Sequence, residues 1–298
     1  MMADQIVGGV ARRPSPWALL GAVALSLATS AALAQGPPPE EPLTPAQQLV
    51  KSAGPSPGGY YYVPPPSLPD APMPGADPRD IQGTWFHNQG MEFRIARDMF
   101  GNSAPYTMKG AEIVVRRLKG DRAGKPYTNP SAKCRPPGPQ TQLDLNMPFT
   151  VFQSKDWIRF VFEEFHGRWQ IITNPDAVPA PAEKAYMGHS VGHWDGSTLV
   201  VETKDFKQAM WLDVEGTPLS ANGKLTQRIR KVDNGDREPY LEIITTIDDP
   251  VYYTKPWSVV RSFGWTPNLA YHKEYNCEEQ IGDRSVDADA GLVPEPKD

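Results

Sequence analysis

The chain has 298 residues, of which 39% are hydrophobic and 22% are charged, and its formal net charge is −5 at pH 7. A mildly acidic chain without a basic stripe lacks the electrostatic footprint of a protein that binds nucleic acid or an anionic membrane surface, so the sequence argues against both partners. After residue 34 it contains no run of about 18 apolar residues that would predict a membrane-spanning helix.

The first 34 residues have the pattern of a secretory signal peptide. Arg12 and Arg13 precede an apolar run over residues 17–34 that is too short for a membrane span and ends on small residues at Ala34. We therefore expect a periplasmic or secreted mature chain that begins near Gln35. Losing two arginines and one aspartate changes its net charge from −5 to −6. Prolines follow the arginine pair where a twin-arginine signal has apolar residues, so Tat export is the alternative to the general route.

A proline-rich segment follows over residues 35–79. Of the 33 prolines, 14 lie between residues 36 and 80. Proline removes a backbone donor and fixes φ, so we predict an extended, partly disordered tether. Within it, Thr44 followed by Pro45 is a helix start signal that predicts one or two helical turns over residues 44–52.

Short apolar runs separated by turn residues dominate residues 80–281, a texture typical of antiparallel β-structure. The clearest hairpin places Ile158, Phe160 and Phe162 on one face before a turn and a second run. Asp-Gly and Asn-Gly dipeptides mark several further turns. We predict strands over residues 83–87, 148–153, 156–163, 169–172, 198–203, 224–232, 240–248, 257–263 and 271–277.

Helix is sparse. Residues 91–100 and 111–118 are candidates for short helices, although Ile113, Val114 and Val115 would also suit a strand. Because strands and helices do not alternate, a doubly wound α/β fold is unfavourable. We predict an all-β chain with a single antiparallel barrel of about eight to ten strands over residues 80–281, followed by a flexible acidic tail over residues 282–298.

The two cysteines, Cys134 and Cys277, both lie in the expected mature chain. An exported protein with two cysteines most simply pairs them, and closing so long a loop removes roughly 4 to 5 kcal/mol of unfolded-state entropy in the ideal model. No second cysteine is near either one in the sequence, which is unfavourable for a metal–thiolate site. We also predict no cofactor, since nucleotide cofactors are scarce outside the cytoplasm.

Residues 188–192 read GHSVG, which matches the nucleophile elbow of α/β-hydrolases, with Ser190 as the nucleophile. Asp248 or Asp249 followed by His272 would supply the usual triad order. The motif requires a buried strand before it and a helix after it, whereas a proline-bearing loop precedes it and a turn at residues 194–196 follows it. A serine hydrolase is therefore the least favoured enzyme class.

His189 and His193 raise the question of a metal or an acid–base site. On a strand they share a face but lie about 13 Å apart, too far to bind one ion, so we predict no metal centre. If that face lines a barrel lumen, the two imidazoles provide acid–base groups, with Glu202 and Asp248 as carboxylate partners. These four residues are the candidate catalytic set.

Charged and aromatic residues within the strands suggest a ligand pocket. Arg159 and Arg261 are charges in the middle of strands, and a buried charge must be paired or serve a ligand. Tryptophans would line an apolar or aromatic pocket. The candidate ligand-binding residues are Trp85, Arg159, Trp194, Trp257 and Arg261.

Three blocks carry a family resemblance. Residues 188–206 read GHSVGHWDGSTLVVETKDF, residues 247–257 read IDDPVYYTKPW, and residues 274–277 read EYNC, while WLD stands at residues 211–213. These blocks resemble a family of exported, largely uncharacterised bacterial proteins with GHSxGxWEGDTLVVDT-like and DPxxYTKPW-like blocks and an EYxC ending. The resemblance covers about residues 77–280 and implies export but no particular activity. The departures are Asp195, Ser197 and Glu202 for Glu, Asp and Asp, and a different loop at residues 174–176.

A fainter likeness is to lipocalin-type barrels. Gly83, Thr84 and Trp85 match their G-x-W on a first strand, and the likeness implies that Arg261 packs over Trp85. A barrel of about eight strands has room for one small ligand.

Three functions follow from these observations. The first is an exported barrel that binds a small, mostly apolar or aromatic molecule in its lumen. The second is an acid–base enzyme on the same barrel, a lyase, isomerase or hydrolase that uses a lumen histidine with a carboxylate. The third is a structural envelope protein with a lumen filled by side chains.

Overall fold

The computed structural model describes residues 41–54, 74–88, 94–123, 135–145, 147–163, 167–179, 182–207 and 209–267. All described elements belong to one compact unit, which begins at Pro42. The predicted signal peptide, Cys134, Cys277, the predicted strand over residues 271–277 and the predicted acidic tail lie outside the described residues.

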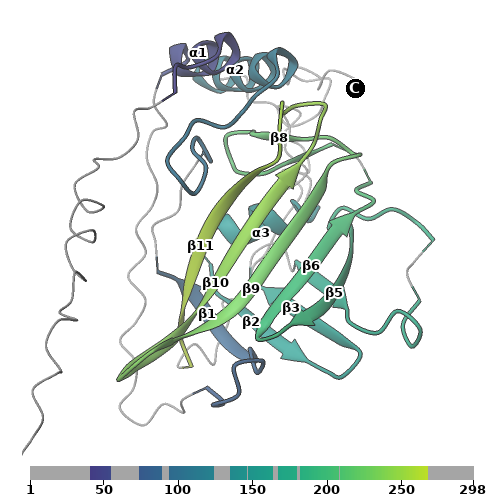
Figure 1. Cartoon of the computed structure of the whole chain (residues 1–298). Coiled ribbons are helices and arrows are strands. Elements are labelled where there is room, and N and C mark those ends of the chain that lie inside the picture. The colour runs from purple at the N-terminus through teal and green to yellow at the C-terminus, as the bar shows by residue number, and fades with distance from the viewer. Residues whose placement is uncertain are drawn as a thin grey trace, which may run out of the picture. The chain divides into compact units, whose positions relative to one another are not determined.

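Nine strands close into a barrel, as the sequence predicts (Figure 1). Their order around the barrel is β1-β11-β10-β9-β6-β5-β4-β3-β2. The strands are β1 Gly83–His87, β2 Phe149–Gln153, β3 Trp157–Phe162, β4 Arg168–Ile172, β5 His189–Asp195, β6 Thr198–Lys204, β9 Lys224–Asn234, β10 Arg237–Asp248 and β11 Trp257–Trp265.

One pair of neighbours breaks the predicted antiparallel pattern. β4 and β5 run parallel, with Ile171 opposite Ser190 and Ile172 opposite Val191. Parallel neighbours need a long crossover, and residues 173–188 provide it by returning the chain to the end of the barrel where β4 began. All other neighbouring strands of the barrel are antiparallel.

The first helix, α1 (Pro45–Ser52), confirms the start signal at Thr44. The Thr44 side chain accepts from the Gln47 N–H at 3.3 Å, and the Gln47 side chain accepts from the Thr44 N–H at 2.9 Å, which forms a capping box. Ala46 and Val50 are buried in the same apolar cluster as α2 residues. Part of the expected tether therefore belongs to the folded unit.

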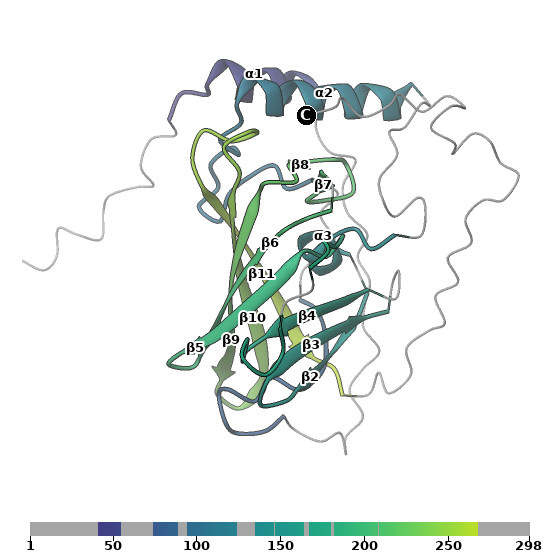
Figure 2. The same cartoon turned by 90° about the vertical axis from the view of Figure 1, so that its right-hand side faces the viewer.

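Two further helices differ in how far the sequence predicted them. α2 (Met108–Arg122) contains the candidate helix over residues 111–118 and lies beside α1 (Figure 2). Residues 94–100 are not helical, and Arg97 forms a β-bridge with Ser103 instead. α3 (Pro139–Asp144) was not predicted, nor were the short strands β7 (Met210–Trp211) and β8 (Pro218–Leu219), which lie outside the barrel.

The wall of the barrel is uneven because its strands differ in length. β1 to β4 have five or six residues each, whereas β9, β10 and β11 have 11, 12 and 9. β1 pairs with the last three residues of β11, and within the described ranges no strand lies beside the first part of β11 on that edge. The backbone N–H groups of Asn88 and Met99 bond to Ser262 O at 3.0 Å and Ser258 O at 2.7 Å along that edge.

Two apolar clusters follow from this unevenness. Where all nine strands are present, aromatic side chains pack against one another, with ring centroids of Phe149 and Phe263 at 4.9 Å and of Phe160 and Trp169 at 4.9 Å. Beyond the short strands, α1, α2, β7 and β8 close the other half around Tyr253 and Trp257. Figure 2 shows α3 below β7 and β8. Gln142 of α3 lies beside Gly167, the residue before β4 begins.

Candidate functional site

A layer of polar side chains separates the two apolar clusters inside the barrel. On β9 the inward residues run Leu225, Gln227, Ile229, so the polar residue lies between members of the two clusters. β10 and β11 repeat the pattern at Thr245 and Arg261. We call the following residues, none more than 8% exposed, the polar layer: His87, Ser190, Thr203, Gln227, Thr245 and Arg261.

One side of the polar layer is a chain of hydrogen bonds. Trp169 Nε1 donates to Ser190 Oγ at 2.7 Å, Ser190 Oγ lies 2.7 Å from Thr203 Oγ1, and Thr203 donates to Gln227 Oε1 at 3.3 Å. Gln227 is opposite Thr245 on β10. Its Nε2 is buried and has no hydrogen-bond partner among the described residues. The chain therefore ends on an amide donor inside the barrel.

α3 faces the polar layer, and its amino-acid composition is unusual for a buried helix. Its sequence is PQTQLD, four of its six residues are polar, and all six are buried. The hydroxyl of Thr141 donates to Trp211 O at 2.6 Å, and Gly167 leaves room for the Gln142 side chain beside it. Burying polar groups costs free energy unless they form hydrogen bonds. The composition of α3 is thus matched to a polar environment.

A buried ion pair joins α3 to the barrel wall. Arg261 Nε donates to Asp144 Oδ1, and the two side chains are 10% and 2% exposed. Burial raises the pKa of Asp144 to about 6, although Arg261 and Gln140 oppose that shift. The carboxylate is therefore mostly ionised at neutral pH and balances the charge of Arg261.

His87 adds a neutral imidazole beside this pair. Burial lowers the pKa of His87 to about 4, against the raising effect of the Leu143 carbonyl and with a small lowering effect of Arg261. The ring lies 4.5 Å from that of Phe263, and its Nε2 bonds to Leu143 O. Since a carbonyl only accepts, Nε2 carries the proton and Nδ1 is an acceptor. Nδ1 is buried without a hydrogen-bond partner in the described part of the chain.

The predicted catalytic histidines do not line the lumen, and that expectation is wrong. His189, Val191 and His193 share one face of β5, but it is the outer face, where Val191 is 43% exposed. The inward residues are Ser190 and Gly192. A Cβ at Gly192 would lie 2.7 Å from Ile171 Cγ2, so the inner face of β5 has no room for an imidazole.

Glu202 and Asp248 also lie on the outside of the barrel. Their carboxylates flank Lys224 Nζ at 4.0 and 3.5 Å and are 49% and 43% exposed. His189 Nδ1 instead lies 3.7 Å from Asp205 Oδ2. The structure therefore does not bring the four candidate catalytic residues together around a lumen.

Of the predicted ligand-binding residues, only Arg261 belongs to the polar layer. Trp85 is fully buried in the aromatic cluster, where its Nε1 donates to Ile81 O at 3.0 Å and its ring meets Trp265 edge to face at 5.1 Å. Arg261, which the lipocalin likeness places over Trp85, forms an ion pair with Asp144. Trp257 is 4% exposed and packs in the other cluster.

The other two predicted ligand-binding residues lie at the periphery. Arg159 stacks on Trp157 at 4.7 Å and donates to Gln170 Oε1 at 2.6 Å on the outside of β3 and β4. Trp194 is half-buried near the end of β5, with the Arg79 guanidinium 6.0 Å from its ring. Arg159 and Trp194 therefore each have a local structural partner.

Ser190 is not a nucleophile on a strand-to-helix corner. It lies within β5, β5 leads through a turn into β6, and its hydroxyl is bound to Thr203 and Trp169. The geometry that the GHSVG motif requires is absent around Ser190, so the serine-hydrolase interpretation is wrong on this point. His272 lies outside the described residues.

Sequence reasoning missed His87, Asp144, Gln227 and α3. Two of these had a signal in the sequence: His87 follows Trp85 on the inward face of β1, and Pro139 after Gly138 marks the start of α3. Polar residues on a strand are expected to face solvent unless the inward face of that strand is already known.

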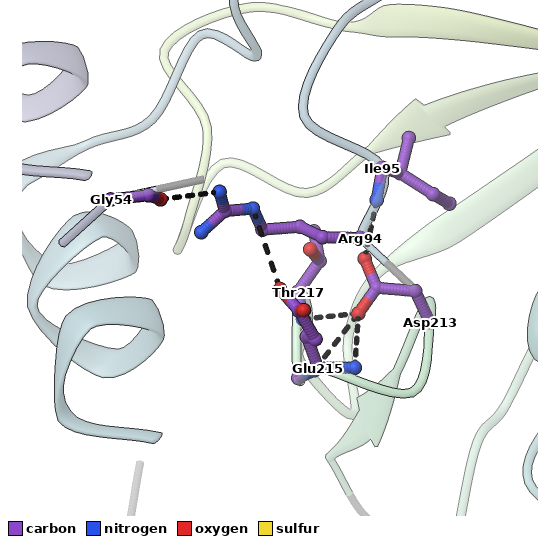
Figure 3. A network of polar contacts seen from close by, with 7 residues as sticks. Gly54, Arg94, Ile95, Asp213, Glu215 and Thr217 are labelled. Carbon is purple, nitrogen blue, oxygen red and sulfur yellow. Dashed lines mark hydrogen bonds and ion pairs between the residues drawn. The ribbon is translucent and has the colours of Figure 1, made fainter. Parts of the chain in front are cut away.

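A second buried polar cluster lies around Asp213 and has a structural role (Figure 3). One Asp213 oxygen accepts from the N–H groups of Glu215, Gly216 and Thr217 at 2.8 to 3.1 Å, and the other accepts from Ile95 N–H at 2.8 Å. Arg94 donates to Gly54 O at 3.0 Å and lies 3.6 Å from Glu215 Oε2. These contacts join three distant segments of the backbone.

Comparisons with models of protein families, with curated proteins and with solved structures find no match for this chain. Among the described residues, no helix is both long and apolar enough to cross a membrane. In the same part of the chain, no three His, Cys, Asp or Glu side chains gather as metal ligands do.

Proposed function

We propose that this protein binds a small molecule inside its barrel, between α3 and the polar layer. The observation that carries the proposal is the burial of a polar helix against polar strand positions where His87 Nδ1 and Gln227 Nε2 have no partner in the described residues. Such groups cost free energy until a ligand or water satisfies them. A ligand that satisfies both would recover that cost on binding.

The aromatic cluster below the polar layer is the floor of the proposed site. Its side chains are at most 3% exposed at Phe149, Phe160, Phe162, Trp169 and Phe263. Because these rings already pack on one another, we place the ligand at the polar layer rather than among them. Any apolar part of the ligand would contact these rings. We therefore still expect a preference for aromatic compounds, but for ones that also carry a polar group.

A purely structural barrel is a poorer account of these residues. Well-packed apolar side chains in place of a buried ion pair are often neutral or stabilising. In a purely structural barrel, leucine side chains would stabilise these positions better than polar ones. The positions instead hold the pair of Arg261 with Asp144, the neutral His87 and the polar face of α3. We therefore favour binding over a structural role.

Native mass spectrometry of the intact chain against a library of small metabolites tests the proposal. We expect at least one compound to bind, and Gln227→Met to weaken its binding at least tenfold because the amide donor is lost. Thr226→Val is the matched control, since Thr226 is the next residue on β9 and faces outward. The proposal fails if no compound binds, or if both variants weaken binding equally.

An acid–base enzyme on the same site is the second candidate. The lumen does contain a histidine and a carboxylate, but they are His87 and Asp144 rather than the predicted residues. The same mass spectra separate the two functions, because a carrier releases its compound unchanged whereas an enzyme changes its mass.

We also propose that the chain is exported, as a member of the exported bacterial family that it resembles. The support is the leader over residues 1–34 and the sequence blocks around Ser190 and Asp249. N-terminal sequencing of the protein from a periplasmic fraction is expected to give a start near Gln35, and recovery of Met1 would refute export.

Alkylation of that sample without reduction is expected to leave Cys134 and Cys277 unmodified, as a disulfide requires.

A further inference from the structure

We infer that the occupant of the polar layer is an uncharged molecule with a hydroxyl group, and that this hydroxyl donates to His87 Nδ1. The inference rests on the proposed function and names the chemical class of its ligand. It follows from the charge balance of the site and from the direction of its hydrogen bonds.

The charges that face the polar layer already cancel. Arg261 carries one positive charge and Asp144 one negative charge, in direct contact. Asp213, whose field also reaches Asp144, is compensated by four backbone N–H groups. A charged ligand would bring an uncompensated charge into a buried site, which costs several kcal/mol per ion. An uncharged ligand avoids that cost.

The polar atoms without a partner indicate what the ligand must offer. Asp144 Oδ2 is buried without a hydrogen-bond partner among the described residues, so it requires a donor. The Nε2–H of His87 is committed to Leu143 O, so Nδ1 requires a donor. Gln227 Oε1 already accepts from Thr203, so the free Nε2 requires an acceptor. A hydroxyl group can donate and accept, whereas an ether or a ketone only accepts. A hydrocarbon would satisfy neither residue.

Four probes with one carbon frame test the inference: benzyl alcohol, benzoate, benzylamine and toluene, titrated calorimetrically into the full chain at pH 7. We expect benzyl alcohol to bind at least tenfold more tightly than the other three. Equal binding of benzoate or benzylamine would overturn the uncharged class, and equal binding of toluene would overturn the hydroxyl. If none binds, the inference fails for this class, while the metabolite library decides the proposed function separately.

Two substitutions of His87 locate the acceptor. His87→Gln keeps a donor that can reach Leu143 O but has no acceptor at the Nδ1 position, so we expect at least a tenfold loss of benzyl alcohol binding. His87→Asn places its side-chain oxygen near the Nδ1 position, so we expect binding within threefold of the parent chain. The reverse order would overturn the role of Nδ1. Thermal unfolding of each variant checks that a loss of binding is not a loss of fold.

Discussion

Replacing Asp144 by Ala is expected to lower the free energy of unfolding by about 3 to 5 kcal/mol, because it leaves the Arg261 guanidinium charged and unpaired inside the barrel. Arg261 is only 8% exposed, and its side chain contacts α3 through this carboxylate. Urea unfolding of the variant and the parent chain at neutral pH measures the difference.

An outer ion pair provides the control for this variant. Arg230 Nε lies 2.7 Å from Glu242 Oε1, but its side chain is 52% exposed, so Arg230→Met is expected to cost about 1 kcal/mol or less. Replacing both buried partners, Asp144→Leu with Arg261→Met, is expected to recover most of the loss, since no charge is then left unpaired. A cost for Asp144→Ala no larger than that of Arg230→Met would contradict the buried pairing.

The second large effect concerns pH, where Asp144 and His87 act in opposite directions. The folded-state pKa of Asp144 is raised from 3.8 to about 6, so the folded chain holds a proton that the unfolded chain releases between these values. Its contribution to the free energy of unfolding therefore falls as the pH rises through that window, by about 3 kcal/mol. The folded-state pKa of His87 is lowered from 6.5 to about 4, and its contribution rises between these values by a similar amount.

In the parent chain the two contributions nearly cancel, and single substitutions separate them. Relative to the parent, His87→Gln is expected to lose stability as the pH rises from about 4 to about 6.5, because only the contribution of Asp144 remains. Asp144→Asn is expected to gain stability over the same range. Urea unfolding at several pH values measures both slopes, and parallel curves for the three proteins would show that neither group is perturbed by burial.

Much of the barrel could be predicted because its signals are local. Strict alternation at Ile158, Phe160 and Phe162 fixes both the existence of β3 and its inward face. The capping signal at Thr44 likewise depends on neighbouring residues alone. The parallel pairing of β4 with β5 could not be predicted, since it depends on where a long crossover returns the chain.

The site itself escaped prediction because tertiary packing defines it. α3 has six residues, most of them polar, and such a sequence predicts an exposed turn. Its burial follows from the short strands of the barrel wall beside it, which the local sequence does not reveal. The phase of β5 was misassigned because His189, Val191 and His193 look like a functional face, whereas the small residues between them occupy the lumen.

Residues of the family-like blocks prove to hold loops together. Asp213 collects four backbone N–H groups, and Asp249 accepts from the N–H and hydroxyl of Ser220 at 2.7 and 2.9 Å. Tyr253 donates to Pro218 O at 2.6 Å. In these three residues the blocks therefore serve the architecture of the loops rather than chemistry.

The parallel contact between β4 and β5 has a mechanical consequence. It joins only two residue pairs, and the closure between β1 and β11 joins three, whereas β9 and β10 share ten. β1 shares three residue pairs with β2 as well, so the pairing around the barrel is weakest between β4 and β5. We therefore expect the barrel wall to open first between β4 and β5, where few backbone hydrogen bonds must break, while β9, β10 and β11 stay paired.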